Sequence, residues 1–342
     1  MKIGTREINN SVDPLIIAEI GINHNGSIKI AKEMVDSAKN AGVEVIKHQT
    51  HIIDDEMTKE AKNIFPPNDN RSIWEIMKVS SISKEEEISL KHFTEELGMI
   101  YISTPFSRKA ADFLNKINVP AFKIGSGECD NFLLLEHISQ FGKPIILSTG
   151  MQSLETIKKS VEILEKSNVD YALLECTNLY PSPPENVSLK GITDLKKTFP
   201  KNIIGFSDHS IGPEMSLAAV ALGASIIERH FTDSRYRSGP DISCSMEPNE
   251  LRYLIDRSKE IHIALNNPKR RTPEEEEVYK FARSSIVADK QIKKGQLISK
   301  EDIWARRPGN GDIPGKDYKK IIGKKINKTK KINEQLSWTD FD

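Results

Sequence analysis

Short runs rich in β-branched and aromatic residues recur along the first 231 residues, and segments with helical apolar spacing separate most of them. Eight runs are predicted strands: 15–21, 43–49, 99–105, 121–127, 144–150, 171–177, 202–208 and 225–231. Several intervening segments end, as helices often do, in glycine: Gly42, Gly98, Gly142 and Gly223. Eight strands with crossover helices predict an α/β fold, a (β/α)8 TIM barrel whose strands are buried on both faces.

A doubly wound sheet is the structural alternative. Such a sheet usually carries a GxGxxG phosphate turn after its first strand, and residues 21–26 read GINHNG instead. The longest connection, 51–83, follows the second strand. We expect this insertion to fold over the barrel mouth, either as a surface excursion or as a substrate lid.

The texture of the chain changes after the last strand. Residues 250–266 read as a closing helix, which gives a catalytic barrel domain over 1–266. Residues 267–280 are polar, highly charged and contain two prolines, so we interpret them as a linker. Residues 281–342 hold short β-type runs broken by Gly and Pro, which indicates a small, mainly β second domain.

Charge supports this division. The chain has 49 Lys+Arg and 49 Asp+Glu, a balance that gives no reason to expect nucleic acid or a membrane surface as partner. Residues 281–342 nevertheless carry 15 basic and 8 acidic side chains, so the preceding part is acidic by the same margin.

Compartment signals are plain. The start of the chain has no apolar segment of a secretory signal, and the longest mostly apolar stretch, 215–227, is too short to span a bilayer. Cys129, Cys176 and Cys244 are far apart, which argues against a disulfide framework or a structural zinc site. We expect a cytoplasmic protein.

Catalytic residues of a (β/α)8 barrel lie at the carboxyl ends of its strands. All eight predicted ends carry polar or ionisable residues: Glu19 and the His24 loop, Lys47, Gln49, Thr104, Lys123, Ser126, Glu128, Ser148, Asn178, Tyr180, Ser207, His209, Glu228 and His230. Alternation sharpens the prediction. If Lys47 points inward, so do residues 43, 45 and 49, while Ile46 and His48 face the helices.

Two chemical subsets stand out at these ends. Lysine charges combined with neutral donors suit a phosphate or carboxylate, and the set is Lys47, Lys123, Ser126, Ser148, Asn178 and Ser207. His209 and His230 come from neighbouring strands and could share a divalent cation, although ordinary hydrogen-bonded histidines are an equal alternative. Tyr236 and Trp304 could line a pocket, but packing is the simpler interpretation for both.

The sequence resembles the bacterial sialic acid synthases along almost its entire length. The similar segments are 19–26 (EIGINHNG), 46–51 (IKHQTH), 103–108 (STPFSR), 122–129 (FKIGSGEC), 147–151 (LSTGM), 176–181 (CTNLYP), 206–209 (FSDH), 228–233 (ERHFTD), 239–242 (GPDI) and 307–311 (RPGNG). The resemblance implies condensation of phosphoenolpyruvate with N-acetylmannosamine to give N-acetylneuraminate and phosphate. It also implies an antifreeze-like (SAF, β-clip) second domain.

The resemblance further implies roles for residues. It implies a divalent metal on His209 and His230, typically Mn²⁺ with Mg²⁺ or Co²⁺ as alternatives, and an active-site carboxylate at Glu19. The phosphoenolpyruvate positions are Lys47, Lys123, Ser126, Ser148, Asn178 and Ser207; those near the sugar are Gln49, Thr104, Phe106, Glu128, Tyr180 and Asp241. It implies a domain-swapped homodimer in which Arg307 reaches the partner's site. One departure is visible, because Glu175 stands where relatives often carry His.

Three alternatives stay open. The nearest is a related synthase that makes legionaminic or pseudaminic acid, or N-acetylneuraminate 9-phosphate, with only the sugar pocket changed. A metal-dependent barrel aldolase would act without phosphoenolpyruvate. A carbohydrate- or ice-binding protein would use the second domain alone.

Overall fold

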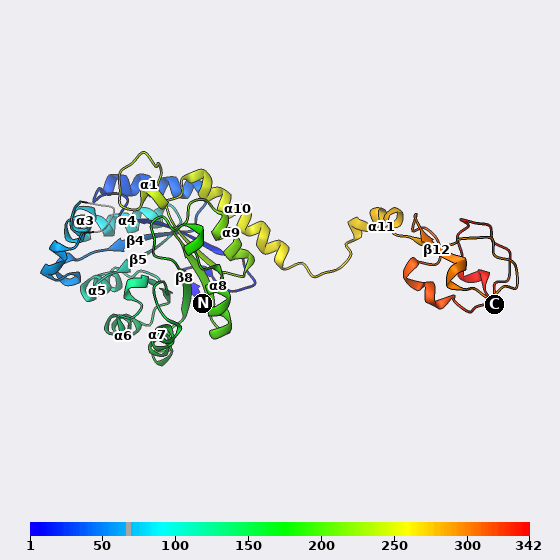
Figure 1. Cartoon of the computed structure of the whole chain (residues 1–342). Helices are drawn as coiled ribbons and strands as arrows, with labels where there is room; N and C mark the ends of the chain where they lie inside the picture. Colours follow the sequence, from blue (N-terminus) through cyan, green and yellow to red (C-terminus); the bar gives the residue numbers. More distant parts are fainter. Residues whose placement is uncertain (66–69) are drawn as a thin grey trace. The chain divides into compact units, whose positions relative to one another are not determined.

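The computed structural model describes residues 1–65 and 70–342, so Pro66 and Pro67 of the insertion lie outside the described residues. The chain divides into two compact units, Met1–Asn267 and Pro268–Asp342 (Figure 1). The segment 267–280 that we interpreted as a linker contains the 3₁₀ turn η5 (Pro273–Glu275) and most of helix α11 (Glu276–Ala282).

The first unit is a closed barrel of eight parallel strands, as predicted, and β10 pairs with β3 to close it. The strands are β3 (Leu15–Gly21), β4 (Val45–Thr50), β5 (Ile100–Pro105), β6 (Phe122–Ile124), β7 (Ile145–Ser148), β8 (Tyr171–Cys176), β9 (Ile203–Asp208) and β10 (Ile226–His230). They pair in chain order around the barrel. Neighbours in sequence are therefore neighbours in space at the barrel mouth.

Helices connect consecutive strands and surround the barrel (Figure 1). They are α1 (Ile28–Ala41), α4 (Lys84–Glu96), α5 (Arg108–Lys116), α6 (Phe132–Ser139), α7 (Leu154–Lys166), α8 (Leu189–Thr198), α9 (Glu214–Ala221) and α10 (Pro248–Leu265). Serine N-caps begin several of them, and Ser83 forms a capping box with Glu86 at α4. Gly42 ends α1 in the left-handed conformation with φ 95°, as its position predicted.

Six of the eight strands start one or two residues later than predicted, and β4 differs most. We expected Val43 to point into the barrel, and this was wrong: β4 begins at Val45, and Val43 packs with the helix layer. The reason is that the Val43 amide still donates to the Ala38 carbonyl at the end of α1. Ile46 does face the helices, as alternation predicted.

The barrel interior has an apolar lower layer and a polar upper layer. The lower layer contains Leu15, Ile17, Val45, Ile102, Ala121, Ile146, Ala172, Leu174 and Ile226, and residues of the N-terminal hairpin β1–β2 (Lys2–Ile3, Arg6–Glu7) pack beneath it. Gly205 makes this layer possible, because a Cβ there would lie 2.4 Å from Leu174 Cδ2 and 2.5 Å from the Ile226 carbonyl oxygen. The polar layer above it forms the candidate site.

The insertion after β4 folds into α2 (Ile53–Glu56), η1 (Lys59–Asn63) and α3 (Ile73–Ser80). The end of α3 packs closely against the loop after β3. A Cβ on Gly26, which has φ 72°, would lie 2.3 Å from the Val79 carbonyl oxygen. Only glycine fits this contact, which brings α3 beside the barrel mouth.

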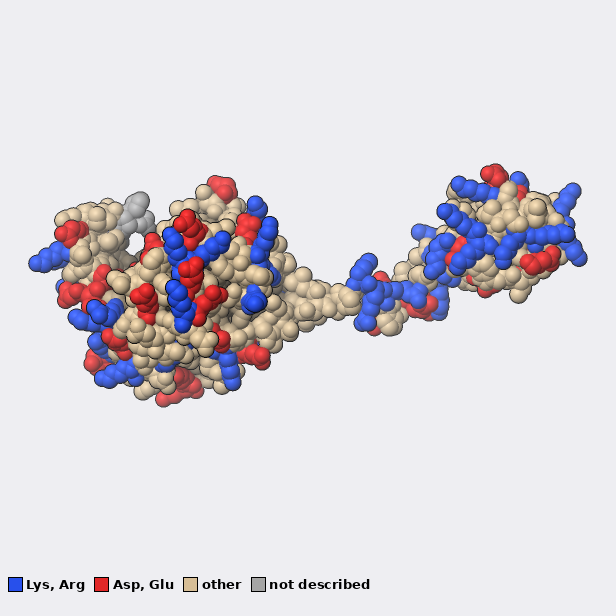
Figure 2. Space-filling model, turned by 90° about the horizontal axis from the view of Figure 1, so that it is seen from below, with Lys and Arg blue, Asp and Glu red and all other residues tan. Residues whose placement is uncertain are grey.

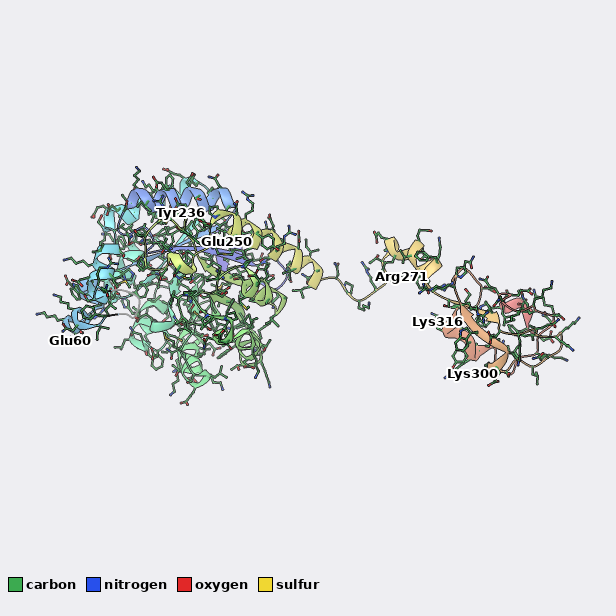
Figure 3. The ribbon with its side chains drawn as sticks, turned by 45° about the horizontal axis from the view of Figure 1, so that its top comes forward. Glu60, Tyr236, Glu250, Arg271, Lys300 and Lys316 are labelled. Carbon is green, nitrogen blue, oxygen red and sulfur yellow. The ribbon has the colours of Figure 1, made fainter. Side chains whose placement is uncertain are left out.

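The second unit is a small antiparallel structure around β11 (Ser285–Ala288) and β12 (Ile303–Arg306), with turns η6 (Lys300–Asp302), η7 (Gly315–Lys320) and η8 (Trp338–Asp340). Its core is largely isoleucine. Asp340 is fully buried and pairs with Lys330 at 2.7 Å. Lys and Arg outnumber Asp and Glu on the face of this unit seen in Figure 2. Figure 3 labels two of the lysines of this unit, Lys300 and Lys316.

Among the described residues, no helix combines the length and the apolar character needed to cross a bilayer.

Candidate active site

Four buried charges lie at the top of the barrel interior, and we call them the charged floor: Glu19, Lys47, Lys123 and Glu228. Lys47 forms an ion pair with Glu19, and its Nζ lies 3.7 Å from Glu228 Oε1. Lys123 Nζ lies 3.7 Å from the same Glu228 oxygen. The two lysines of the predicted anion-binding set are therefore each compensated by a carboxylate.

Burial and neighbouring charge set the protonation of the floor. Burial raises the pKa of Glu19 even though Lys47 lies beside it. Burial also acts to raise the pKa of Glu228, but the charges of Lys123 and Lys47 outweigh burial, so the pKa of Glu228 is lowered. Burial lowers the pKa of Lys123. Glu19 is therefore the floor carboxyl that most readily holds a proton, which suits acid–base work.

Neutral donors surround Lys123. Its Nζ donates to Ser148 Oγ at 2.7 Å, and Ser207 Oγ donates to Glu228 at 3.3 Å. Ser126 Oγ accepts from the Gly150 amide at 3.1 Å. A Cβ on Gly150 would lie 2.0 Å from Asn178 Oδ1, so this glycine lets Asn178 and Ser126 approach each other. Five of the six predicted anion-binding residues are thus brought together around β6, β7, β8 and β9, and Lys47 of β4 is joined to them through Glu228.

A cavity of about 650 Å³ opens at the barrel mouth. Five of the predicted sugar-side and metal residues line it: Gln49, Phe106, Tyr180, His230 and Asp241. Gln49 Nε2 donates to Glu19 Oε1 at 2.9 Å, and Lys47 Nζ donates to Thr104 Oγ1 at 3.2 Å. The bond from Gln49 to Glu19 connects the cavity to the charged floor.

His209 and His230 face each other with ring centroids 5.2 Å apart. Burial lowers the pKa of both, so both are neutral and can offer a lone pair to a metal. His209 Nδ1 lies 2.7 Å from the Thr177 carbonyl oxygen; donation there leaves Nε2 unprotonated, the usual second contact of a metal-binding histidine. The Tyr180 ring packs 4.1 Å from that of His209.

The surroundings of the histidines also fit a cation. His230 Nδ1 is buried without a hydrogen-bond partner among the described residues, and it lies 3.6 Å from Asp241 Oδ2. Burial, followed by the charge of Glu19, raises the pKa of Asp241 to about 7. Within 1–65 and 70–342, no group of three or more His, Cys, Asp or Glu side chains is arranged to hold a metal. A cation here would therefore take further ligands from water or substrate.

Comparison with known proteins gives the family. The NeuB family model matches residues 34–270, and the SAF domain model matches residues 283–342. The chain belongs to the NeuB family. It is therefore one of the sialic acid synthase-like enzymes, with a C-terminal SAF domain.

Three relatives illustrate the range of this NeuB-family chain. It is 36% identical to the N,N'-diacetyllegionaminic acid synthase of Campylobacter jejuni, over 94% of this chain and 98% of the relative. It is 34% identical to human N-acetylneuraminate-9-phosphate synthase, over 91% and 88%. The crystal structure of an N-acetylneuraminic acid synthetase from Leptospira borgpetersenii, in complex with citrate, matches with a TM-score of 0.73 and 32% identity, over 81% and 94%.

Two predicted site residues of this NeuB-family chain, Glu128 and Arg307, make no contact with the charged floor among the interactions of the described residues. Glu128 follows β6 in the turn η2 (Ser126–Glu128), is half-buried, and accepts a 2.6 Å bond from Asn131. Burial raises its pKa. Arg307 is exposed in the second unit, so its role in a partner's site stays a prediction.

His24 was expected at the mouth, and it faces the helix layer instead. Its Nε2 lies 3.0 Å from His48 Nε2, and His48 Nδ1 lies 3.4 Å from Glu87 of α4. Tyr236 also differs from expectation, because it is fully exposed rather than packed (Figure 3).

The residue-by-residue prediction left out three contributors to the site. Glu228 was noted at a strand end but given no role, although alternation with His230 placed it inside. His51 was not among the predicted site residues, yet its ring stacks on that of Phe106 at 4.5 Å and its Nε2 lies 3.2 Å from Gln49 Oε1. The α3 wall, which we define as Ile73, Ile76, Met77 and Val79, lines the cavity. No sequence signal specified which insertion residues would do so.

Glu175 does not reach the site. Leu174 packs inside the barrel, and Glu175, the next residue, faces α8 on the outside, where a Cβ on Gly191 would lie 2.4 Å from its carboxylate. Burial raises the pKa of Glu175 to about 7. The departure from relatives at this position therefore affects the helix layer and not the sugar pocket.

We predict that Glu175→Gln stabilises the NeuB-family barrel at pH 8. Below pH 4.5 both the folded and unfolded states hold the proton, but above it the unfolded state releases the proton that the folded state keeps up to about pH 7. The wild-type free energy of unfolding therefore falls across this window, by on the order of 3 kcal/mol. Urea unfolding at pH 4.5 and pH 8 checks this. An equal difference between variant and wild type at both pH values would contradict it.

Proposed function

We propose that the chain condenses phosphoenolpyruvate with N-acetylmannosamine, giving N-acetylneuraminate and phosphate. The observation that carries this proposal is the charged floor, with its cluster of neutral donors, beneath a mouth cavity lined by Gln49, Tyr180 and Asp241. Family membership supports the reaction class. The relatives include an N,N'-diacetyllegionaminic acid synthase and an N-acetylneuraminate-9-phosphate synthase, so the acceptor sugar is the part of the proposal that needs testing.

The donor substrate would lie over Lys123. Its ammonium, the Ser148 hydroxyl 2.7 Å away, Ser126 and Asn178 offer charge and neutral hydrogen bonds to a phosphate. Asn178 Oδ1 and Glu228 Oε2 are buried without hydrogen-bond partners among the described residues. A buried acceptor left in that state costs about 1–3 kcal/mol, so these two oxygens fit a site in which a substrate hydroxyl or a water donates to them, while the phosphate stays with Lys123.

His209 and His230 would hold a divalent cation, Mn²⁺ by preference, with Mg²⁺ or Co²⁺ as alternatives. When bound, the cation acts as a Lewis acid toward the aldehyde oxygen of the acceptor. The neutral state of both imidazoles, caused by burial, favours binding.

Glu19 would move the proton. It is fully buried, it accepts from Gln49 at 2.9 Å, and burial raises its pKa. In the condensation the enol carbon of phosphoenolpyruvate bonds to the aldehyde carbon, water adds to the resulting cationic centre, and phosphate leaves. Glu19 is placed to stabilise that cation or to take the proton from the attacking water.

The cavity wall bears on the acceptor. The α3 wall is aliphatic, which favours an acceptor whose far end is uncharged over one that carries a phosphate. Arg71 lines the same side of the cavity and already has an interaction within the chain. The aliphatic wall supports N-acetylmannosamine, or an analogue of the legionaminic type, over its 6-phosphate, whereas the positive charge of Arg71 would suit the 6-phosphate.

The function is tested by phosphate release with phosphoenolpyruvate and Mn²⁺ across a panel of open-chain amino sugars. We expect release with N-acetylmannosamine and a product mass equal to N-acetylneuraminate. Release only with 2,4-diacetamido or 6-phosphate sugars would move the assignment to a related synthase. Product formation from a carbonyl acceptor without phosphoenolpyruvate would instead indicate an aldolase.

We predict that Glu19→Gln lowers kcat by about 10²–10⁴-fold, because the amide cannot exchange the proton. Binding of phosphoenolpyruvate should change only a few-fold, since Lys123 and its donors remain. Glu175→Gln is the matched control, because it makes the same substitution on the outer face of β8 and should leave kcat unchanged. Steady-state phosphate release measures both variants, and full turnover by Glu19→Gln would rule out the role.

We also propose that the protein works as a domain-swapped homodimer in which the basic SAF domain meets an acidic barrel and brings Arg307 to the partner's sugar. The charge excess of residues 281–342 supports this arrangement. Arg307→Ala should raise KM for the sugar about tenfold or more and leave KM for phosphoenolpyruvate unchanged. Sedimentation at low and high salt should show a dimer that weakens with ionic strength. A monomer at low salt, or an unchanged sugar KM, would contradict the arrangement.

A further inference from the structure

A second buried ion pair lies directly behind the two histidines. Arg229 of β10 and Asp208 of β9 are strand partners in register, and both are 1% exposed. Arg229 is the largest fully buried side chain among the described residues. Because side chains alternate, this pair faces the helix layer while Ser207, Glu228 and His230 face the site.

The pair holds the loop that follows β9. The Arg229 guanidinium donates to Asp208, to the Ser210 carbonyl at 2.6 Å and to the Gly212 carbonyl at 3.1 Å. Asp208 in turn accepts from the Ser210 amide at 2.8 Å and from Ser216 Oγ, on α9, at 2.6 Å. Both strands and α9 are thus tied to one short loop.

His209 is the first residue of that loop. Its carbonyl accepts from the Ser182 amide at 2.9 Å, and its Nδ1 contacts the Thr177 carbonyl, so contacts from the β8 side complete its support. Arg229 immediately precedes His230 in β10. The ion pair therefore fixes the backbone next to both imidazoles, whose ring centroids lie 5.2 Å apart.

Stability alone explains this pair poorly. Most side chains on the same outer face are apolar, such as Ile204, Phe206 and Ile227. Replacing a buried ion pair by apolar residues of similar volume is often neutral or stabilising. What apolar residues could not supply is the set of hydrogen bonds to the Ser210 amide and the two loop carbonyls.

We propose that Asp208 and Arg229 are positioning residues for the divalent cation: they hold His209 and His230 at a ligating separation before the cation arrives. This inference rests on the proposed function, because the cation is part of it. Outer contacts of this kind typically change metal affinity 10–100-fold.

The test measures Mn²⁺ binding to the full chain by the electron paramagnetic resonance signal of free Mn²⁺. The variants are Asp208→Asn, Arg229→Lys and the apolar pair Asp208→Leu with Arg229→Met, each checked for folding by circular dichroism. The matched control is Asp340→Leu with Lys330→Met, which removes the buried ion pair of the second unit. His209→Ala reports whether the measured Mn²⁺ occupies the histidine site.

We expect folded variants of the Asp208–Arg229 pair to weaken the Mn²⁺ Kd 10–100-fold, and the control pair to change it less than twofold. An unchanged Kd in folded variants overturns the positioning role and leaves the proposed reaction intact. Equal weakening by the control pair also overturns it, because the effect would then be a general loss of stability. A wild-type Kd that His209→Ala does not alter removes the metal part of the proposed function together with this inference.

Discussion

Compensation of buried charge is the constraint on which the barrel mouth depends. Glu19, Lys47, Lys123 and Glu228 are all within 5% of full burial, where an unpaired charge would cost several kcal/mol. Their pairing requires the strands to be in one register, and Glu19 and Lys47 are indeed strand partners. A shift of one residue would turn these charges toward the apolar helix layer. The chemistry of the site and the correct closure of the barrel are therefore stabilised by the same contacts.

Side chains on the inner and outer faces of the barrel strands have different roles. Toward the interior, β9 and β10 offer Ser207, Glu228 and His230 to the site, and toward the helices they offer the Asp208–Arg229 pair that holds the following loop. Behind β3 and β4, His24, His48 and Glu87 form a comparable polar group between strands and helices. The polar residues of the outer face thus support the loops, while those of the inner face are placed for chemistry. Glu175 is a polar residue of the outer face for which no such loop contact is seen among the described residues.

Much of this arrangement could be predicted. The barrel followed from eight strand-like runs, and alternation placed Gln49 on the same strand face as Lys47. The prediction was wrong or incomplete at positions whose structure depends on contacts between residues far apart in the chain. Val43 was placed in a strand because its residue type fits one, but its amide bonds to the end of α1. The carboxylate partners of the two lysines were not predicted, because the sequence does not show which carboxylates lie opposite them. His51 and the α3 wall were missed because an insertion has no periodicity that fixes which side chains face a cavity.

The sequence by itself determined the strand and helix order, the family, and the residue types at each strand end, because these depend on local periodicity and on motifs. Tertiary structure decided which of those residues meet. In the folded chain Glu228 lies between both lysines, and the ring centroids of His209 and His230 lie 5.2 Å apart. His24 and Glu175 face away from the site, and α3 lies beside the cavity. These outcomes depend on barrel closure and on contacts such as Gly26 with Val79, which join residues far apart in the chain and have no local signature.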